Sequence, residues 1–203
     1  FRTNLGIRFV MDALMKGGIP FHMKDAIPNL FAHWISLDII AYLRLVSGTG
    51  NTRANWLRIM NRPNRYIKRE ALAPFTSDIS VAQLKAYYQD KDWMLERLDR
   101  LEYDLSIMKR MSPYAAIHYL SNAMKYQDYL KDYAKEHHIN EQELLDVLNA
   151  VHESSQSCRT FAEWFTYIDT YTEELQKQAK SPASKDANNE SGVCLCTLHC
   201  AKG

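Results

Sequence analysis

The sequence has little that would tie it to a membrane or to an oxidising compartment. No apolar run approaches the roughly 20 residues that a membrane span requires. The N-terminus lacks the basic, apolar and small-residue sections of a signal peptide. Only four of the 203 residues are cysteine, and three of these crowd the last ten residues, which is not a disulfide framework. We therefore expect a cytoplasmic, reduced chain with no membrane partner.

The sequence also has almost no excess of charge of one sign, and it has few glycines. The formal net charge is +1, so an argument for a nucleic-acid partner must depend on local clustering. Only seven glycines are present, and no G-x-x-x-x-G-K-[ST] phosphate loop occurs. We therefore expect that this chain alone does not hydrolyse ATP and holds no cofactor or metal of its own. Hydrophobic residues make up 46% of the chain, which is enough for a core without metal or disulfide staples.

Most of the chain has helical spacing of apolar residues. The spacing predicts helices at 5–16, 29–45, 53–60, 80–88, 92–108, 113–120, 123–137, 141–152 and 160–179. Capping-box patterns mark three of these starts, with Ser80 and Gln83, Asn140 and Glu143, and Thr160 and Glu163, while Ser112 precedes Pro113 at a fourth. Residues 19–23 and 193–198 favour short strands, and the polar stretch 180–191 favours a linker. A helical body between extended edges suggests a domain inserted into an α/β parent.

Both ends of the chain resemble motor motifs of superfamily 1 DNA helicases. Residues 1–8 read Phe-Arg-Thr-Asn-Leu-Gly-Ile-Arg and resemble motif IV, and residues 197–203 read Thr-Leu-His-Cys-Ala-Lys-Gly and resemble motif V. Residues 18–21, 38–45 and 61–67 resemble three further segments of the family, in family order. The chain therefore resembles a UvrD/Rep/PcrA-like helicase from motif IV to motif V. It lacks an initiator Met and ends on an apolar run, so we expect an internal piece of a longer protein.

The resemblance implies a mainly α fold, with a helical accessory (2B-like) subdomain and a small β edge from the second RecA-like motor domain. The expected boundaries are a motor-domain edge at 1–23, the accessory subdomain at 24–180, a linker at 181–191 and a second motor-domain edge at 192–203. The implied parent is an ATP-dependent DNA helicase that uses Mg²⁺ and moves 3′ to 5′ on single-stranded DNA. DNA repair, replication and recombination are all compatible roles. The rival interpretation is a non-enzymatic helical protein-interaction domain.

Four terminal residues resemble nucleotide-binding positions of the family, in the intact parent only. Phe1 matches an adenine-stacking aromatic residue and Arg2 matches the arginine that contacts the γ-phosphate, while Lys202 and Gly203 close motif V. A flat ring offers a base a stacking face, and a guanidinium stabilises charge on a transferring phosphoryl group. The alternative without a function for Arg2 is a solvated terminal side chain.

Thr197 and His199 resemble the motif V groups that contact the backbone of single-stranded DNA. A hydroxyl and an imidazole both donate hydrogen bonds to phosphate oxygens. The alternative is a strand end with a solvated histidine. Cys194, Cys196, His199 and Cys200 also offer metal-ligand chemistry, but zinc sites draw ligand pairs from separate segments. We therefore expect no metal site here and interpret these cysteines as small residues of a buried strand.

One basic stretch indicates nucleic-acid binding from its residues alone, apart from the resemblance to helicases. Residues 39–69 contain no Asp or Glu, and Trp56 and Tyr66 lie among their cations. The expected DNA-binding side chains are Arg53, Arg58, Arg62, Arg65, Lys68 and Arg69, with duplex DNA as their partner. The alternative is a set of structural arginines paired with acids from elsewhere, such as Asp90, Asp92 and Glu96. Tyr66-Ile67-Lys68 replaces the family's Gly-Ile-Gly, so close approach of the backbone through glycines is not expected.

Aromatic residues are frequent in the helical body outside that stretch. They are Tyr87, Tyr88, Trp93, Tyr103, Tyr114, Tyr119, Tyr126, Tyr129, Trp164 and Tyr167. Their helical spacing favours packing against neighbouring helices over platforms for stacking bases.

Overall fold

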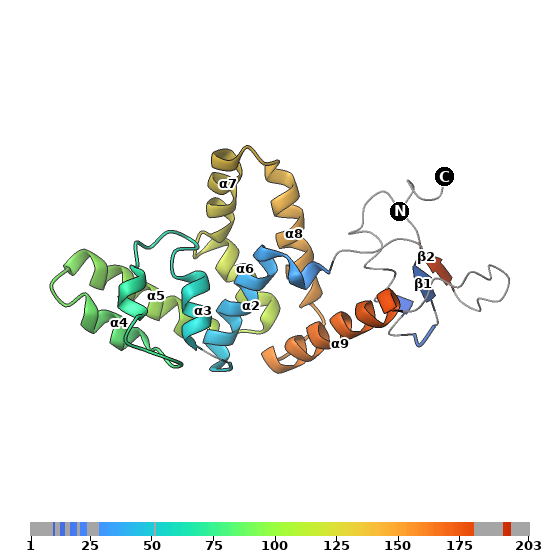
Figure 1. Ribbon diagram of the computed structural model, residues 1–203, viewed down its shortest axis with the longest axis horizontal. Helices are drawn as coiled ribbons and strands as arrows, with labels where there is room; N and C mark the ends of the chain where they lie inside the picture. Colours follow the sequence, from blue (N-terminus) through green and yellow to red (C-terminus); the bar gives the residue numbers. More distant parts are fainter. Residues whose placement is uncertain are drawn as a thin grey trace. The chain divides into compact units, whose positions relative to one another are not determined.

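The computed structural model describes residues 10, 13–14, 17–19, 21–23, 29–50, 52–180 and 193–195. Across these residues the fold is mainly α, which confirms the expected class. The chain divides into two compact units, one formed by residues 1–32 and 166–203 and the other by residues 33–165 (Figure 1). The expected helix at 5–16 and linker at 181–191 lie largely outside the described residues. The boundaries of the expected accessory subdomain stay a prediction.

Helix α2 (Trp34–Ser47) forms the centre of the unit 33–165. It packs against α3 (Thr52–Ile59), α5 (Asp92–Met108), α6 (Pro113–Asn122) and α8 (Glu141–Ser154). Its fully buried side chains include Ile35, Ile39, Tyr42 and Leu43. A helix with apolar side chains on nearly every face is stable only inside a core, and α2 has that composition. Gly48 ends it with φ 70°, a left-handed conformation that glycine adopts without strain.

Three further elements complete this unit. Helix α4 (Val81–Tyr87) packs on α5, and α7 (Tyr126–His137) lies beside α8 as an antiparallel pair (Figure 1). A 3-10 helix, η2 (Arg69–Leu72), contacts α3 and α4. It was not predicted, because four residues are too few for a periodic pattern.

The helix starts follow the expected capping residues. Ser80 forms a capping box with Gln83, and Ser112 accepts a hydrogen bond from the N–H of Ala115 ahead of Pro113 at the first turn. Asn140 caps α8 through the N–H of Gln142. These side chains satisfy backbone donors that a helix N-terminus leaves unpaired, which is why they locate the starts well.

The start of α7 differs from the expected residue 123. Helix α6 continues to Asn122, and α7 begins only at Tyr126. Lys125 between them has φ 64°, a left-handed conformation that breaks the helix. Lysine rarely adopts this conformation, so the sequence pattern gave no warning of the break.

The other unit contains a short parallel strand pair and most of one long helix. Strands β1 (Phe21–Met23) and β2 (Val193–Leu195) pair in the register Phe21 to Val193 and Met23 to Leu195. The 3-10 helix η1 (Leu30–Ala32) packs Phe31 edge-to-face on Tyr167 and Tyr171, with ring centroids 5.9 and 5.3 Å apart. Both tyrosines belong to α9 (Phe161–Lys180). That the strand pair is the edge of a RecA-like motor domain stays a prediction.

Candidate nucleic-acid interface

The loop of residues 60–68 follows α3 and is held in shape by one amide side chain. Asn61 Oδ1 accepts hydrogen bonds from the backbone N–H groups of Arg65 at 3.2 Å and Ile67 at 2.9 Å. Asn61 Nδ2 donates to the carbonyl oxygen of Ile67 at 2.8 Å. Asn64 Oδ1 accepts from the N–H of Tyr66 at 3.1 Å, and Tyr66 has φ 60°. The loop therefore presents Asn64 and Tyr66 to solvent in a fixed conformation.

Two arginines of the basic stretch converge on one buried carboxylate. Asp38 of α2 is fully buried, and Arg62 Nη1 donates to its two oxygens at 2.9 and 3.1 Å. Arg58 Nε lies 2.9 Å from Asp38 Oδ1, and Arg58 Nη2 donates to the carbonyl of Trp34 at 3.2 Å. Tyr126 of α7 donates its hydroxyl to Asp38 Oδ2 at 2.9 Å. This ionic cluster joins α2, α3, α7 and the loop.

The carboxylate depends on these partners. Burial raises the pKa of Asp38 above its ordinary value of 3.8, while the charge of Arg62, the hydrogen bond from Tyr126 and the charge of Arg58 oppose that rise. Burial, followed by the charge of Asp38, raises the pKa of Tyr126 well above 10.0, so its hydroxyl remains a donor. A carboxylate in a low-dielectric interior is stable only while such donors surround it.

Two more arginines of the stretch have backbone partners. Arg53 Nε donates to the carbonyl of Leu72 at 3.3 Å, which ties α3 to η2. Arg65 Nη1 donates to the carbonyl of Ile59 at 3.1 Å, and its guanidinium lies 5.6 Å from the centroid of the Tyr42 ring. Both contacts are intramolecular and help to stabilise the fold around α3.

The partner acid differs from those that the structural alternative named. Among the described residues, Arg58 and Arg62 pair with Asp38 rather than with Asp90, Asp92 or Glu96. Asp38 precedes the acid-free stretch by one residue, and the packing of α3 against α2 places it beside the two arginines. DNA contact by Arg53, Arg58 and Arg62 stays a prediction, but these three side chains already have partners within the fold.

Lys68 and Arg69 have different surroundings. Both residues are exposed, and within the described part of the chain neither side chain makes an ion pair. The backbone N–H of Lys68 donates to the hydroxyl of buried Tyr88 at 2.7 Å, which fixes the end of the loop. These two side chains remain available for a phosphate.

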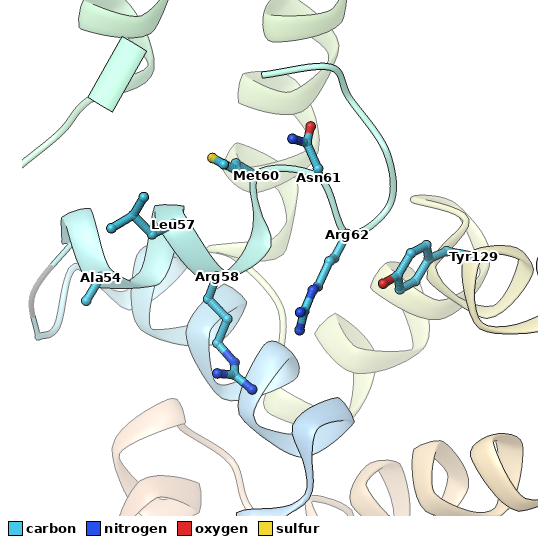
Figure 2. A pocket seen from close by; sticks show the side chains of 7 residues that line it. All are labelled: Ala54, Leu57, Arg58, Met60, Asn61, Arg62 and Tyr129. Carbon is cyan, nitrogen blue, oxygen red and sulfur yellow. The ribbon is translucent and has the colours of Figure 1, made fainter. Parts of the chain in front are cut away.

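A cavity of about 440 Å³ is lined by residues of α3, the loop and α7, and Figure 2 shows the side chains that line it. The side chains of Arg58 and Arg62 point to the same side, toward α2, while Asn61 points away from them. Tyr129 of α7 completes the wall beside Arg62. Because both cations are turned toward Asp38, the cavity has less positive charge to offer than its arginines suggest.

A second cavity, of about 300 Å³, lies between the loop, α5 and the α6–α7 turn, and we call it the cationic groove. Its lining residues are Pro63, Asn64, Arg65, Arg97, Arg100, Leu101, Asp104, Ala123, Met124 and Lys125. Four of them are cations and only Asp104 is acidic. Asp104 is itself buried, accepts from Tyr119 at 2.8 Å and pairs with Arg100 at 3.3 Å. Lys125 is exposed, and among the described residues its ion pair is a surface one with Asp128.

Sequence reasoning missed three cations of the groove, Arg97, Arg100 and Lys125. Acids that alternate with cations along α5 hide the two arginines in any count of local charge. The signal that could have found them is helical spacing, because Trp93, Arg97 and Arg100 stand at i, i+4 and i+7 and so share one face. Lys125 carries no comparable signal, since its position depends on the left-handed turn before α7.

Several expected site residues lie outside the described residues. They are Phe1, Arg2, Cys196, Thr197, His199, Cys200, Lys202 and Gly203, and the side chain of Cys194 is likewise not described. Their roles stay predictions, and no nucleotide-site geometry follows from the structure. Within the described ranges no group of three His, Cys, Asp or Glu side chains is placed to hold a metal ion, and no helix there is long and apolar enough to cross a bilayer.

A comparison with protein families identifies the family of the chain. The family model described as UvrD-like helicase C-terminal domain matches residues 1–203. No curated protein matches the chain. Since the match extends over every residue, including both ends that resemble motor motifs, the chain belongs to the family of UvrD-like helicase C-terminal domains.

Proposed function

We propose that the chain is part of an ATP-dependent DNA helicase that moves 3′ to 5′ along single-stranded DNA and separates duplex DNA. The family match over residues 1–203 supports a helicase parent. In the proposed parent, hydrolysis of ATP would supply the free energy for movement, and Mg²⁺ would neutralise charge on the phosphates. Phe1, Arg2, Lys202 and Gly203 would contribute one wall of that nucleotide site, and Thr197 and His199 would contact the translocated strand.

The 2B-like accessory subdomain is proposed at 24–180, which includes the unit 33–165, and its role is to contact DNA. The observation that carries this role is the cationic groove, where four cations meet a single acid, Asp104, which pairs with one of them, Arg100. Exposed Lys68 and Arg69 add positive charge on the adjoining loop and η2. Phosphates favour such a cluster because their binding releases counterions. Alone, the chain is proposed to bind DNA without hydrolysing ATP.

Salt dependence tests the DNA contact. Anisotropy of a labelled duplex with a 3′ single-stranded tail should report binding by the 203-residue chain. Affinity should fall between about 50 and 200 mM salt, with a log–log slope of about −3 for four phosphate contacts. Lys125→Ala should weaken binding, and Lys109→Ala, which removes an exposed cation outside the groove, should not. Binding without salt dependence, or equal loss in both variants, would contradict the proposal.

The parent activity needs a separate assay. The intact helicase should unwind a duplex with a 3′ tail, but not one with a 5′ tail, in the presence of ATP and Mg²⁺. Arg2→Ala in the intact protein should abolish ATP hydrolysis while leaving DNA binding in place. A preference for the 5′ tail would contradict the direction, and unwinding without ATP would contradict the motor.

A further inference from the structure

Two exposed aromatic rings lie beside the cationic groove. Tyr66 of the loop is 57% exposed and Trp93 of α5 is 50% exposed, and their ring centroids are 6.4 Å apart at an interplanar angle of 74°. The guanidinium of Arg97 lies over both rings, 4.9 Å from the Tyr66 centroid and 5.4 Å from the Trp93 centroid. We call these three residues the aromatic corner. Helical spacing predicted a packing role for Trp93, but half of its surface faces solvent.

The backbone holds Tyr66 in a conformation that tyrosine seldom adopts. Its φ of 60° is left-handed, and Asn64 and Asn61 fix the loop on either side of it. A bulky residue pays a steric cost for this conformation. The ring is thus placed against Trp93 and Arg97 rather than folded into the core, and hydrophobic burial does not explain its position.

The aromatic corner and the cationic groove share one residue. Arg97 lies over both rings and also lines the groove with Arg65, Arg100 and Lys125. A ligand that contacts both parts needs a flat apolar face next to negative charge. An unpaired nucleotide has that chemistry, because its base stacks on aromatic and guanidinium planes while its phosphate attracts cations. A paired base inside a duplex offers no free face to the rings.

We propose that the aromatic corner stacks an unpaired base of single-stranded DNA, whose flanking phosphates lie in the cationic groove. The inference rests on the proposed DNA contact and names its ligand as an unpaired nucleotide rather than the duplex expected from the sequence. Tyr66 and Trp93 supply the stacking faces, and Arg97 holds the two rings together. Arg97, Arg100 and Lys125 contact phosphate. No covalent step is involved.

Tryptophan fluorescence gives a direct readout. Of the four tryptophans, Trp56 and Trp164 are buried, and Trp34 packs against Tyr133 with centroids 4.9 Å apart. Trp93 is the half-exposed one. Saturating the 203-residue chain with a thymidine dodecamer should therefore quench its emission, and a dodecamer of abasic sites should not quench it. In Trp93→Phe the quenching should disappear, while anisotropy still shows binding within about threefold, because phenylalanine keeps a stacking face.

The affinity for the two dodecamers provides a second test of stacking. Trp93→Ala and Tyr66→Ala should each weaken binding of the thymidine dodecamer by about five- to hundredfold, the range for loss of one stacked base. The same changes should leave binding of the abasic dodecamer within about twofold. Tyr114→Ala removes another exposed ring, one that stacks on His152, and should leave both affinities unchanged.

The outcomes separate this inference from the proposed function. If the chain binds neither the dodecamers nor a duplex at low salt, the proposed DNA contact fails. If it binds all of them with equal affinity and without quenching that depends on bases, the DNA contact stands and the stacking inference fails. Equal losses for thymidine and abasic dodecamers in Trp93→Ala would also overturn stacking, because the ring would then act only through the fold.

Discussion

The cations around α3 and those around α5 have opposite surroundings. Arg58 and Arg62 turn inward to fully buried Asp38, whereas Arg97 and Lys125 remain exposed at the cationic groove. In the sequence the first pair stands in a stretch without acids and the second among many acids. Under the proposed DNA contact, local charge density overstates the role of the stretch and hides that of α5. What separates the two pairs is the burial of the partner acid, because Asp38 is fully buried, whereas Asp128, which pairs with Lys125, lies at the surface.

The largest expected effect concerns Asp38, the acid that the two inward-facing arginines share. Asp38→Asn removes the negative charge that Arg58 and Arg62 share, and it weakens the acceptor for Tyr126. We expect a loss of about 3 kcal/mol in the free energy of unfolding, the lower end for a buried pair because both arginines are partly exposed. Urea denaturation measures it. Asp132→Asn, at a surface pair with Lys135, should cost less than about 1 kcal/mol, and equal losses would contradict the cluster's role.

A second change tests the loop of residues 60–68, which lies between the inward-facing arginines and the cationic groove. Asn61→Ala removes three hydrogen bonds to Arg65 and Ile67 and leaves backbone groups of buried Ile67 unpaired. We expect a loss of about 2 kcal/mol in stability. DNA affinity should fall with it, since the loop forms one wall of the groove. Asn64→Ala, which removes one exposed bond, should cost less than about 1 kcal/mol. Unchanged stability in Asn61→Ala would show that the loop holds its shape without this amide.

A smaller effect concerns the backbone at Tyr66. Tyr66→Gly and Tyr66→Ala lose the same ring contacts with Trp93 and Arg97, but only glycine relieves the left-handed φ of 60°. Tyr66→Gly should therefore be more stable than Tyr66→Ala by about 1 kcal/mol. Parallel thermal melts of the two variants measure the difference. An alanine variant that is as stable as the glycine variant would mean that the loop relaxes out of the left-handed region.

Sequence patterns located the helices better than the site. Ser80, Ser112 and Asn140 cap the helices that they were expected to cap, because a cap acts over two or three residues. Lys125 shows the limit, since its left-handed conformation follows from how α6 and α7 pack and not from its own preference. The cationic groove needed the fold as well, because it joins residue 65 to residues 97, 100 and 125. Asp38, the partner of Arg62, lies 24 residues earlier in the sequence, so no local sequence pattern predicts their contact.

The central claim is that the inward-facing arginines support the fold and the groove cations contact DNA. The most direct measurement is the salt dependence of affinity for the tailed duplex in Arg62→Ala and in Arg97→Ala/Lys125→Ala, at a temperature where circular dichroism shows both folded. We expect Arg62→Ala to keep affinity within about twofold with an unchanged slope. The double variant should lose about 1.5 units of slope, at 0.7 to 0.9 for each lost phosphate contact. A reduced slope in Arg62→Ala with an unchanged slope in the double variant would contradict the account.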